Sequence, residues 1–118
     1  MSALRIATVA LARCHASKRL FGIRMEQKQK GSWEFTWAFA MDERSAVREG
    51  YDRETVSGSF TNSLEYPGCP YCGFMTWVRC SCGKLGCWHG EGLFSCPWCG
   101  RTGEVVTVES MSIDGGGM

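Results

Sequence analysis

Alternating apolar and polar positions dominate the first forty residues of the chain. Residues 6–12 (IATVALA) form a continuous apolar run, which predicts a buried strand. Residues 20–28 (LFGIRMEQK) are also strand-like and run into the polar turn QKQKGS. Residues 33–40 (WEFTWAFA) alternate with a period of two and should pair with the preceding segment as a hairpin. One face of this third strand would carry four aromatic side chains: Trp33, Phe35, Trp37 and Phe39.

A short helix is predicted at residues 42–52 (DERSAVREGYD). Asp42 can cap its first turn, Glu43 suits the positive end of the helix dipole, and Gly50 can end it. The rest of the pattern predicts two more strands, at residues 56–60 and 104–109, and a disordered tail at residues 111–118.

The distribution of cysteine divides the chain near Tyr66-Pro67-Gly68. Cys14 precedes this point, and the other seven cysteines follow it within residues 69–99. We therefore expect a β-rich α+β fold in which an N-terminal β lobe packs on a C-terminal zinc ribbon, a β-hairpin with two zinc ions. The expected units are a lobe at residues 1–66 with its helix near 42–52, a zinc-ribbon module with the final strand at 67–110, and the tail at 111–118.

Charge limits the classes of partner. The 118 residues include 13 Lys and Arg against 12 Asp and Glu, which gives a formal net charge of +1. Proteins that bind nucleic acid depend on a clear basic excess, so this balance argues against a nucleic-acid partner. No stretch approaches the ~20 apolar residues of a membrane-spanning helix, so no membrane partner is expected.

Eight cysteines in a chain of this length indicate either disulfides or bound metal. The apolar run at 6–12 follows Arg5, and Ala10-Leu11-Ala12 resembles a signal-peptide cleavage site. The run is short for a signal core, however, so we interpret it as a strand. We therefore expect a cytoplasmic protein, in which a reducing environment leaves clustered cysteines free to hold metal.

Two copies of one motif, CPYCG at residues 69–73 and CPWCG at residues 96–100, point to zinc. In Cys-x-x-Cys-Gly the two thiolates and nearby backbone N–H groups converge on one ion, and glycine supplies the backbone conformation of the turn. Paired motifs at this spacing are typical of a zinc ribbon. A single copy could be a redox pair, but the chain lacks the βαβ context of thioredoxin-like proteins.

The segment RCSCGKLGCWHG at residues 79–90 supplies the remaining candidate ligands. A hairpin loop at residues 83–86 would place Cys82 opposite Cys87 and Cys80 opposite His89, all on one face. The same register brings the two Cys-x-x-Cys motifs together at the base of the ribbon. The sequence thus predicts two nested zinc sites, formed by Cys69, Cys72, Cys96 and Cys99 at the base and by Cys80, Cys82, Cys87 and His89 at the tip.

Other ligand sets remain open. His89 can instead be a partly exposed histidine beside Trp88, and the fourth donor of the second site would then come from Cys14 or His15. Cys14 can equally be a small buried apolar residue. A cross-braced alternative pairs the ligands differently: Cys69 and Cys72 with Cys87 and His89, and Cys80 and Cys82 with Cys96 and Cys99.

No catalytic motif is apparent, and we expect no enzymatic activity. His89-Gly90-Glu91 followed by CPWC superficially resembles the zinc deaminase signature. The four residues between Glu91 and Cys96 leave no room for the strand and helix that separate the two halves of that signature. A catalytic zinc also keeps an open position, whereas this chain offers a full set of thiolates.

The stretch GCPYCGFMTWVRCSCGKLGCWHGEGLFSCPWCG at residues 68–100 resembles the TerY-C metal-binding domain. The resemblance rests on CPYCG, CSCGKLGC and CPWCG in that order. Such domains occur at the C-terminus of VWA proteins encoded in tellurite-resistance and related bacterial stress operons. By position the resemblance implies seven metal ligands: Cys69, Cys72, Cys80, Cys82, Cys87, Cys96 and Cys99.

The resemblance also implies a function, that of a non-enzymatic module acting with protein partners. In the family's setting these are a VWA protein, a protein kinase and a PP2C-type phosphatase. This sequence has no VWA domain, so it is either a piece of such a protein or a free-standing relative. The expected function is protein–protein interaction in a bacterial stress-response complex; the alternatives are a nucleic-acid-binding zinc ribbon and a thiol-based redox or metal sensor.

Overall fold

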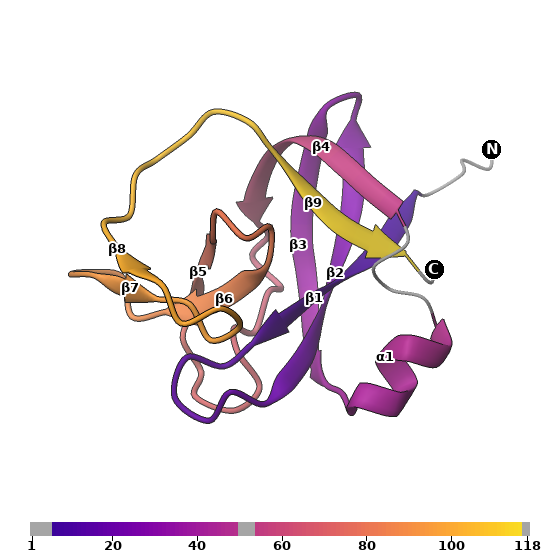
Figure 1. The fold of residues 1–118 in the computed structure, drawn as a ribbon. Coiled ribbons are helices and arrows are strands. Elements are labelled where there is room, and N and C mark those ends of the chain that lie inside the picture. The colour runs from indigo at the N-terminus through magenta and orange to yellow at the C-terminus, as the bar shows by residue number, and fades with distance from the viewer. Residues whose placement is uncertain (1–5, 50–53, 117–118) are drawn as a thin grey trace, which may run out of the picture.

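The computed structural model describes residues 6–49 and 54–116 and consists of strands with one short helix (Figure 1). In chain order the elements are β1 (Ala7–Arg13), β2 (Leu20–Gln29), β3 (Ser32–Ala40), α1 (Glu43–Glu49), β4 (Glu54–Asn62), β5 (Thr76–Arg79), β6 (Leu85–Trp88), β7 (Phe94–Ser95), β8 (Thr102–Gly103) and β9 (Met111–Gly116). The strands at 6–12, 20–28, 33–40 and 56–60 are therefore confirmed within a few residues.

Five of the strands close a ring. β1 pairs with β2, β2 with β3, β4 with β9, and β9 with β1, all antiparallel, while β3 and β4 are parallel. Closure of this kind leaves few exposed strand edges to pair with other chains. In Figure 1 the ring occupies the right-hand part of the molecule, with α1 below it.

The cysteine-rich half continues from one strand of the ring. The β5–β6 hairpin joins the sheet through β6, which runs parallel to the end of β1 with Ala12 beside Leu85 and Arg13 beside Gly86. β7 and β8 form a separate two-stranded sheet beside it (Figure 1). This attachment makes β5 an edge strand of the larger sheet.

A single hydrophobic core joins the ring to the hairpin. The ring of Phe35 from β3 lies 4.3 Å from that of Trp77 on β5, and the Trp77 indole N–H donates to the side chain of Asn62. Buried residues of both halves, among them Ile23, Leu85 and Ile113, belong to the same cluster. Trp77 is thus half-buried and packs against the core, and the proposed division at residue 66 passes through a shared core.

The alternation predicted for the third strand holds only for its first half. Trp33 and Phe35 are buried, but Trp37 is 53% exposed and Ala38 is buried instead. The reason is a β-bulge, because Arg24 pairs with Trp37 whereas Met25 pairs with Phe35, which leaves Thr36 as an extra residue. A bulge of one residue shifts every later side chain to the opposite face.

The helix is confirmed at Glu43–Glu49, where a carboxylate oxygen of Asp42 accepts a hydrogen bond from the backbone N–H of Ser45 at 2.7 Å. The predicted stop at Gly50 lies outside the described residues. In the part of the chain that the structure describes, no helix is long and apolar enough to cross a membrane.

The prediction for the C-terminal segment is wrong. Residues 111–116, expected in a disordered tail, form β9 between β4 and β1, and Ile113 is 1% exposed. The glycines that suggested disorder suit this site, since a Cβ on Gly115 would lie 3.0 Å from the carbonyl oxygen of Val9. Residues 104–109, expected to be the last strand, pair with no strand and cross from β8 to β9.

Candidate metal centre

Three turns of the chain share one backbone hydrogen-bond pattern. At Cys69 and Cys96, the cysteine N–H donates to the carbonyl five residues later, and the glycine four residues later donates back to the cysteine carbonyl. Gly73 and Gly100 adopt φ values of +81° and +80°, which glycine tolerates without strain. The same two hydrogen bonds occur at Cys14, with Arg19 and Lys18 as partners.

The sequence of the turn at Cys14 lacks the signature of a metal-binding turn, so the turn could not be recognised from sequence. Its sequence CHASK has Ser17 where the other turns have a second cysteine, and Lys18 where they have glycine. Lys18 is the one non-glycine residue with positive φ (+60°) among the described residues. The backbone conformation of a metal-binding turn is therefore present without its sequence signature.

Lys18→Gly is expected to stabilise the chain by about 0.5–1 kcal/mol, because a left-handed conformation is costly for a residue with a Cβ. Urea unfolding of the metal-loaded protein measures this difference. Lys30→Gly, a change in the β2–β3 turn beside Gly31, is the control and should not stabilise the chain. Lys30 has no positive φ, so glycine there relieves no strain and only adds conformational entropy to the unfolded chain. Destabilisation by Lys18→Gly would contradict the strain at this position.

A fourth, shorter turn lies at CSCGK, residues 80–84. The N–H of Cys80 donates to the Lys84 carbonyl, and Gly83, at φ +91°, donates back to the Cys80 carbonyl. The turn closes on itself, so β5 ends at Arg79 and β6 begins at Leu85. The Cys-Gly pair in CSCGK, which also occurs in CPYCG, could have indicated this turn from the sequence.

The first cluster of thiols contains Cys14, Cys69, Cys72 and Cys87, whose sulfur atoms all lie within 4.8 Å of one another. Cys14 follows β1 directly and Cys87 lies on β6. Because Arg13 pairs with Gly86 in the parallel register, the next residues along the two strands are neighbours. The cluster thus joins the end of β1, the CPYCG turn and the hairpin.

The second cluster contains Cys80, Cys82, Cys96 and Cys99, with sulfur atoms within the same limit. It joins the CSCGK turn to the CPWCG turn between β7 and β8. Gly86 permits this approach, since a Cβ there would lie 2.8 Å from Cδ of Pro97. Cys82 and Cys99 are exposed, whereas the first cluster has three buried cysteines and one half-buried one.

The spacing of the sulfurs fits a tetrahedral metal ion. Four thiolates at ~2.3 Å from a central zinc would lie about 3.8 Å apart. The Sγ atoms of Cys72 and Cys87 are 3.5 Å apart, those of Cys80 and Cys99 3.6 Å, and those of Cys82 and Cys96 3.8 Å. None of the cysteines forms a disulfide. Each cluster can therefore hold one metal ion, and four sulfur donors favour zinc among common metals.

Each cluster combines one acidic thiol with thiols that resist ionisation. Burial opposes ionisation of Cys14, but hydrogen bonds from Ser17 and the backbone of Ala16 outweigh it and lower the pKa to about 6. Burial raises the pKa of Cys69 to about 11 and that of Cys96 to about 12. Metal binding must displace the protons of the thiols whose pKa is raised. Protons and metal therefore compete for the sulfur atoms at both clusters.

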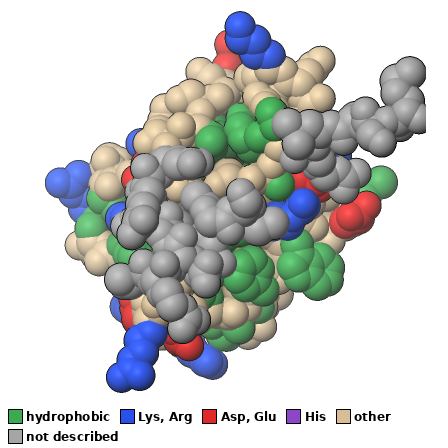
Figure 2. Space-filling view, turned by 90° about the vertical axis from the view of Figure 1, so that its right-hand side faces the viewer, with side chains coloured by type: hydrophobic (Ala, Val, Ile, Leu, Met, Phe, Trp, Pro, Cys, Tyr) green, Lys and Arg blue, Asp and Glu red, His purple; other side chains and the backbone are tan. Residues whose placement is uncertain are grey.

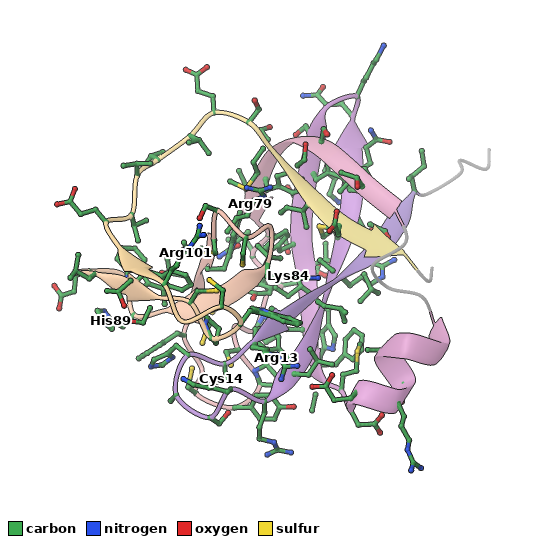
Figure 3. The ribbon with its side chains drawn as sticks, viewed as in Figure 1. Arg13, Cys14, Arg79, Lys84, His89 and Arg101 are labelled. Atoms are coloured by element: carbon green, nitrogen blue, oxygen red, sulfur yellow. The ribbon has the colours of Figure 1, made fainter. Side chains whose placement is uncertain are left out.

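Two histidines lie near the clusters but outside them. His15 stacks on Phe74, and its Nδ1 lies 3.2 Å from Sγ of Cys87. The backbone N–H of His15 also donates to that sulfur, which favours its thiolate form. His89 is exposed on the outer side of the hairpin, away from Cys14, and accepts a hydrogen bond from the backbone N–H of Glu91 (Figure 3).

The predicted nested arrangement is therefore corrected. Cys87 pairs across the hairpin with Trp77 instead of Cys82, and the two Cys-x-x-Cys motifs belong to different clusters. The cross-braced grouping agrees for seven cysteines, with Cys14 in place of His89. The expected loop at residues 83–86 was misplaced because the CSCGK turn already reverses the chain.

The aromatic residues inside the two Cys-x-x-Cys motifs make internal contacts. The Tyr71 hydroxyl donates to the Leu20 carbonyl, and the Trp98 indole N–H donates to the Leu85 carbonyl. Both side chains therefore fasten their turns to neighbouring strands.

Basic side chains do not gather into one stripe. Lys28 lies at the far end of β2 from Arg19, about 30 Å away along the strand, and it pairs with Glu34. Arg13 pairs with Glu43. On the face in Figure 2, blue Lys and Arg side chains are scattered among the described residues.

The model of one protein family matches the chain. It is the TerY-C metal binding domain, and the match covers residues 5–117, nearly the whole chain. No curated protein and no solved structure matches.

Proposed function

The chain belongs to the TerY-C metal-binding domain family, and on this premise we propose that it is a structural zinc module through which proteins of a bacterial stress-response complex assemble. The observation that carries the zinc assignment is the pair of four-cysteine clusters with near-tetrahedral sulfur spacing. Closed sites with four thiolates leave no position for substrate, so the proposed role is non-enzymatic. Two zinc ions would be held, one by Cys14, Cys69, Cys72 and Cys87 and one by Cys80, Cys82, Cys96 and Cys99.

The position of the clusters supports a structural role. The first cluster connects segments that are as many as 73 residues apart in sequence, between Cys14 and Cys87. Zinc held there would fasten the hairpin to the ring, and zinc in the second cluster would fasten β7 and β8 to the hairpin. Such ions supply folding energy directly, about 10–16 kcal/mol in zinc-finger peptides.

The partner is proposed to be a protein of the same cytoplasmic complex, a VWA protein, a protein kinase or a PP2C-type phosphatase. The family assignment supports this proposal, and electrostatics disfavour the nucleic-acid alternative. Eight thiolates and two divalent ions together contribute about −4 to the formal charge of +1. The loaded chain is then acidic, and its affinity for phosphate backbones would be low.

Elemental analysis of the purified chain is expected to give two zinc ions per molecule. Treatment with a strong chelator should abolish its thermal unfolding transition, since the metal-binding energy that supports folding is lost and the ring loses its link to the hairpin. Co-purification from the native bacterium with a VWA protein, a kinase or a PP2C-type phosphatase tests the partner. Two zinc ions with no partner would leave the metal assignment standing and overturn the interaction role.

A sensor function is the second candidate, and the exposure of Cys82 and Cys99 favours it. Exposed zinc thiolates react with oxidants and exchange metal faster than buried ones. Release of the second ion would free the β7–β8 sheet while the first cluster holds the ring together.

A further inference from the structure

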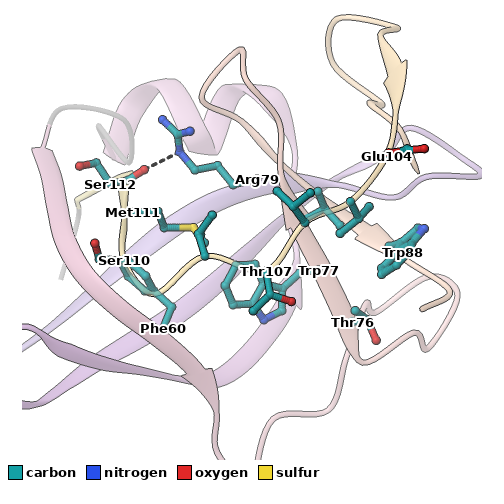
Figure 4. A pocket seen from close by; sticks show the side chains of 14 residues that line it. Phe60, Thr76, Trp77, Arg79, Trp88, Glu104, Thr107, Ser110, Met111 and Ser112 are labelled. Atoms are coloured by element: carbon teal, nitrogen blue, oxygen red, sulfur yellow. Dashed lines mark hydrogen bonds between the residues drawn. The ribbon is translucent and has the colours of Figure 1, made fainter. Parts of the chain in front are cut away.

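A cavity of about 600 Å³ separates the β5–β6 hairpin from the segment 104–110 (Figure 4). Its volume lies in the range of ligand sites in proteins. Aromatic and aliphatic side chains form its floor, chiefly Phe60, Trp77, Trp88 and Met111. The cavity lies outside both cysteine clusters and has no part in metal binding.

One wall of the cavity is the unpaired edge of β5. Thr76, Trp77, Val78 and Arg79 all line it, so it faces the edge of the strand instead of one side of the sheet. The N–H of Cys80 bonds to the Lys84 carbonyl across the hairpin, and main-chain groups alternate in direction along a strand. The N–H and C=O groups of Trp77 and Arg79 therefore point away from β6, toward the cavity.

The opposite wall is a segment without regular secondary structure, which pairs with no strand of the described residues. Residues 104–108 line the cavity consecutively, and their sequence EVVTV has the β-branched composition of a strand. Val106 and Val108 are 74% and 50% exposed. Two segments thus face one another across the cavity; β5 pairs with β6 on its other edge only, and residues 104–108 pair with no strand of the described residues.

The two ends of the cavity carry side chains of opposite charge. The Arg79 guanidinium donates through Nε to the Ser112 carbonyl, and in the described part of the chain no carboxylate pairs with it. Glu104 lies at the other end of the cavity from Ser112, on the side of Trp88 (Figure 4). The Trp88 indole N–H is shielded from solvent and has no hydrogen-bond partner among the described residues.

We propose that this cavity binds an extended segment of a partner protein, which inserts as a strand between β5 and residues 104–108. Its apolar side chains would pack on Trp77 and Trp88, and an acidic side chain would pair with Arg79. The outward main-chain groups of β5 select a peptide over a small molecule, and strand addition to an open sheet edge is an established mode of peptide recognition. This proposal rests on the proposed role as an interaction module and specifies where the partner binds.

The probe for this site is a phage-displayed library of random octapeptides, selected on the zinc-loaded chain. We expect enriched peptides to alternate apolar residues and to carry an acidic residue at one end. A synthetic copy of the strongest peptide, labelled with fluorescein, should bind with a Kd at least tenfold higher for Arg79→Glu and for Val106→Asp. Arg101→Glu, an exposed arginine that bonds Ser81, is the matched control and should change the Kd less than twofold.

Two further variants separate the main chain from the charge. Arg79→Ala removes the charge and the hydrogen bond to Ser112 but keeps the main-chain N–H. Arg79→Pro also removes that outward N–H without breaking a bond to β6, so it should weaken binding further. Zinc content of two ions per chain checks that each variant is folded. If no peptide is enriched, or if binding is unaffected by changes at Arg79 and Val106, the site is wrong. If the natural partner binds the Arg79→Glu and Val106→Asp variants with the same affinity as the unmodified chain, the cavity is not the binding site. The proposed interaction role would still stand in that case.

Discussion

Cys14→Ser should remove one zinc ion and destabilise the chain by more than about 4 kcal/mol, the range in which loss of a metal site falls. Cys14 is 1% exposed and shares its cluster with Cys69, Cys72 and Cys87. Serine is a poor zinc ligand, and the three remaining thiols would stay crowded in an apolar environment. Because the whole protein has only about 5–15 kcal/mol of stability, most molecules would unfold or precipitate.

Zinc content, circular dichroism and soluble yield measure this outcome. His89→Ala is the matched control, since the sequence favoured His89 as a ligand and the structure places it at the surface. That variant should keep two zinc ions and lie within about 0.5 kcal/mol of the unmodified chain. If His89→Ala loses an ion while Cys14→Ser keeps two, the assignment of the first cluster is wrong.

The two ions should leave in sequence, the second cluster losing its ion about tenfold faster or more, because local opening there exposes little buried surface. Cys82 and Cys99 are exposed, whereas Cys14, Cys69 and Cys87 lie in the main core. The elements that the second cluster holds, β7 and β8, have two residues each. Removing this ion should leave the ring of strands folded.

A chelator that changes colour on binding zinc would show two kinetic phases of equal amplitude. Alkylation with iodoacetamide during the first phase should label Cys80, Cys82, Cys96 and Cys99, as read by mass spectrometry of peptides. Cys99→Ser is the companion variant, and it should keep one ion and a cooperative unfolding transition. A single phase with uniform labelling would mean that the two clusters form one cooperative unit.

Local pattern predicted four of the five ring strands and the helix, because apolar patterning and an N-terminal Asp are short-range signals. It failed where tertiary contacts decide. The bulge at Thr36 moves Trp37 to the surface, and no local feature of WEFTWAFA marks it. β9 was missed because its glycines fit a narrow space beside β1, whereas EVVTVE has the composition of a strand but no partner.

The candidate site shows the same limit. Six of the eight cluster cysteines follow from the Cys-x-x-Cys and CSCG spacings and Cys87 from the longer CSCGKLGC, but their partition does not. It depends on the parallel pairing of β1 with β6, between residues more than 70 apart. Cys14 joins the first cluster through that pairing, in a turn with neither a second cysteine nor a glycine. The hairpin loop was expected at residues 83–86, later in the chain than the CSCGK turn that reverses it. That register predicted His89 as a ligand instead of Cys14.

Cadmium-113 NMR of the chain with both zinc ions replaced tests the central claim most directly, because coupling between the metal and cysteine Hβ protons identifies each ligand. Two cadmium resonances are expected. One should couple to Cys14, Cys69, Cys72 and Cys87, and the other to Cys80, Cys82, Cys96 and Cys99. A resonance coupled to both Cys69 and Cys96, or to the ring protons of His89, would contradict this partition.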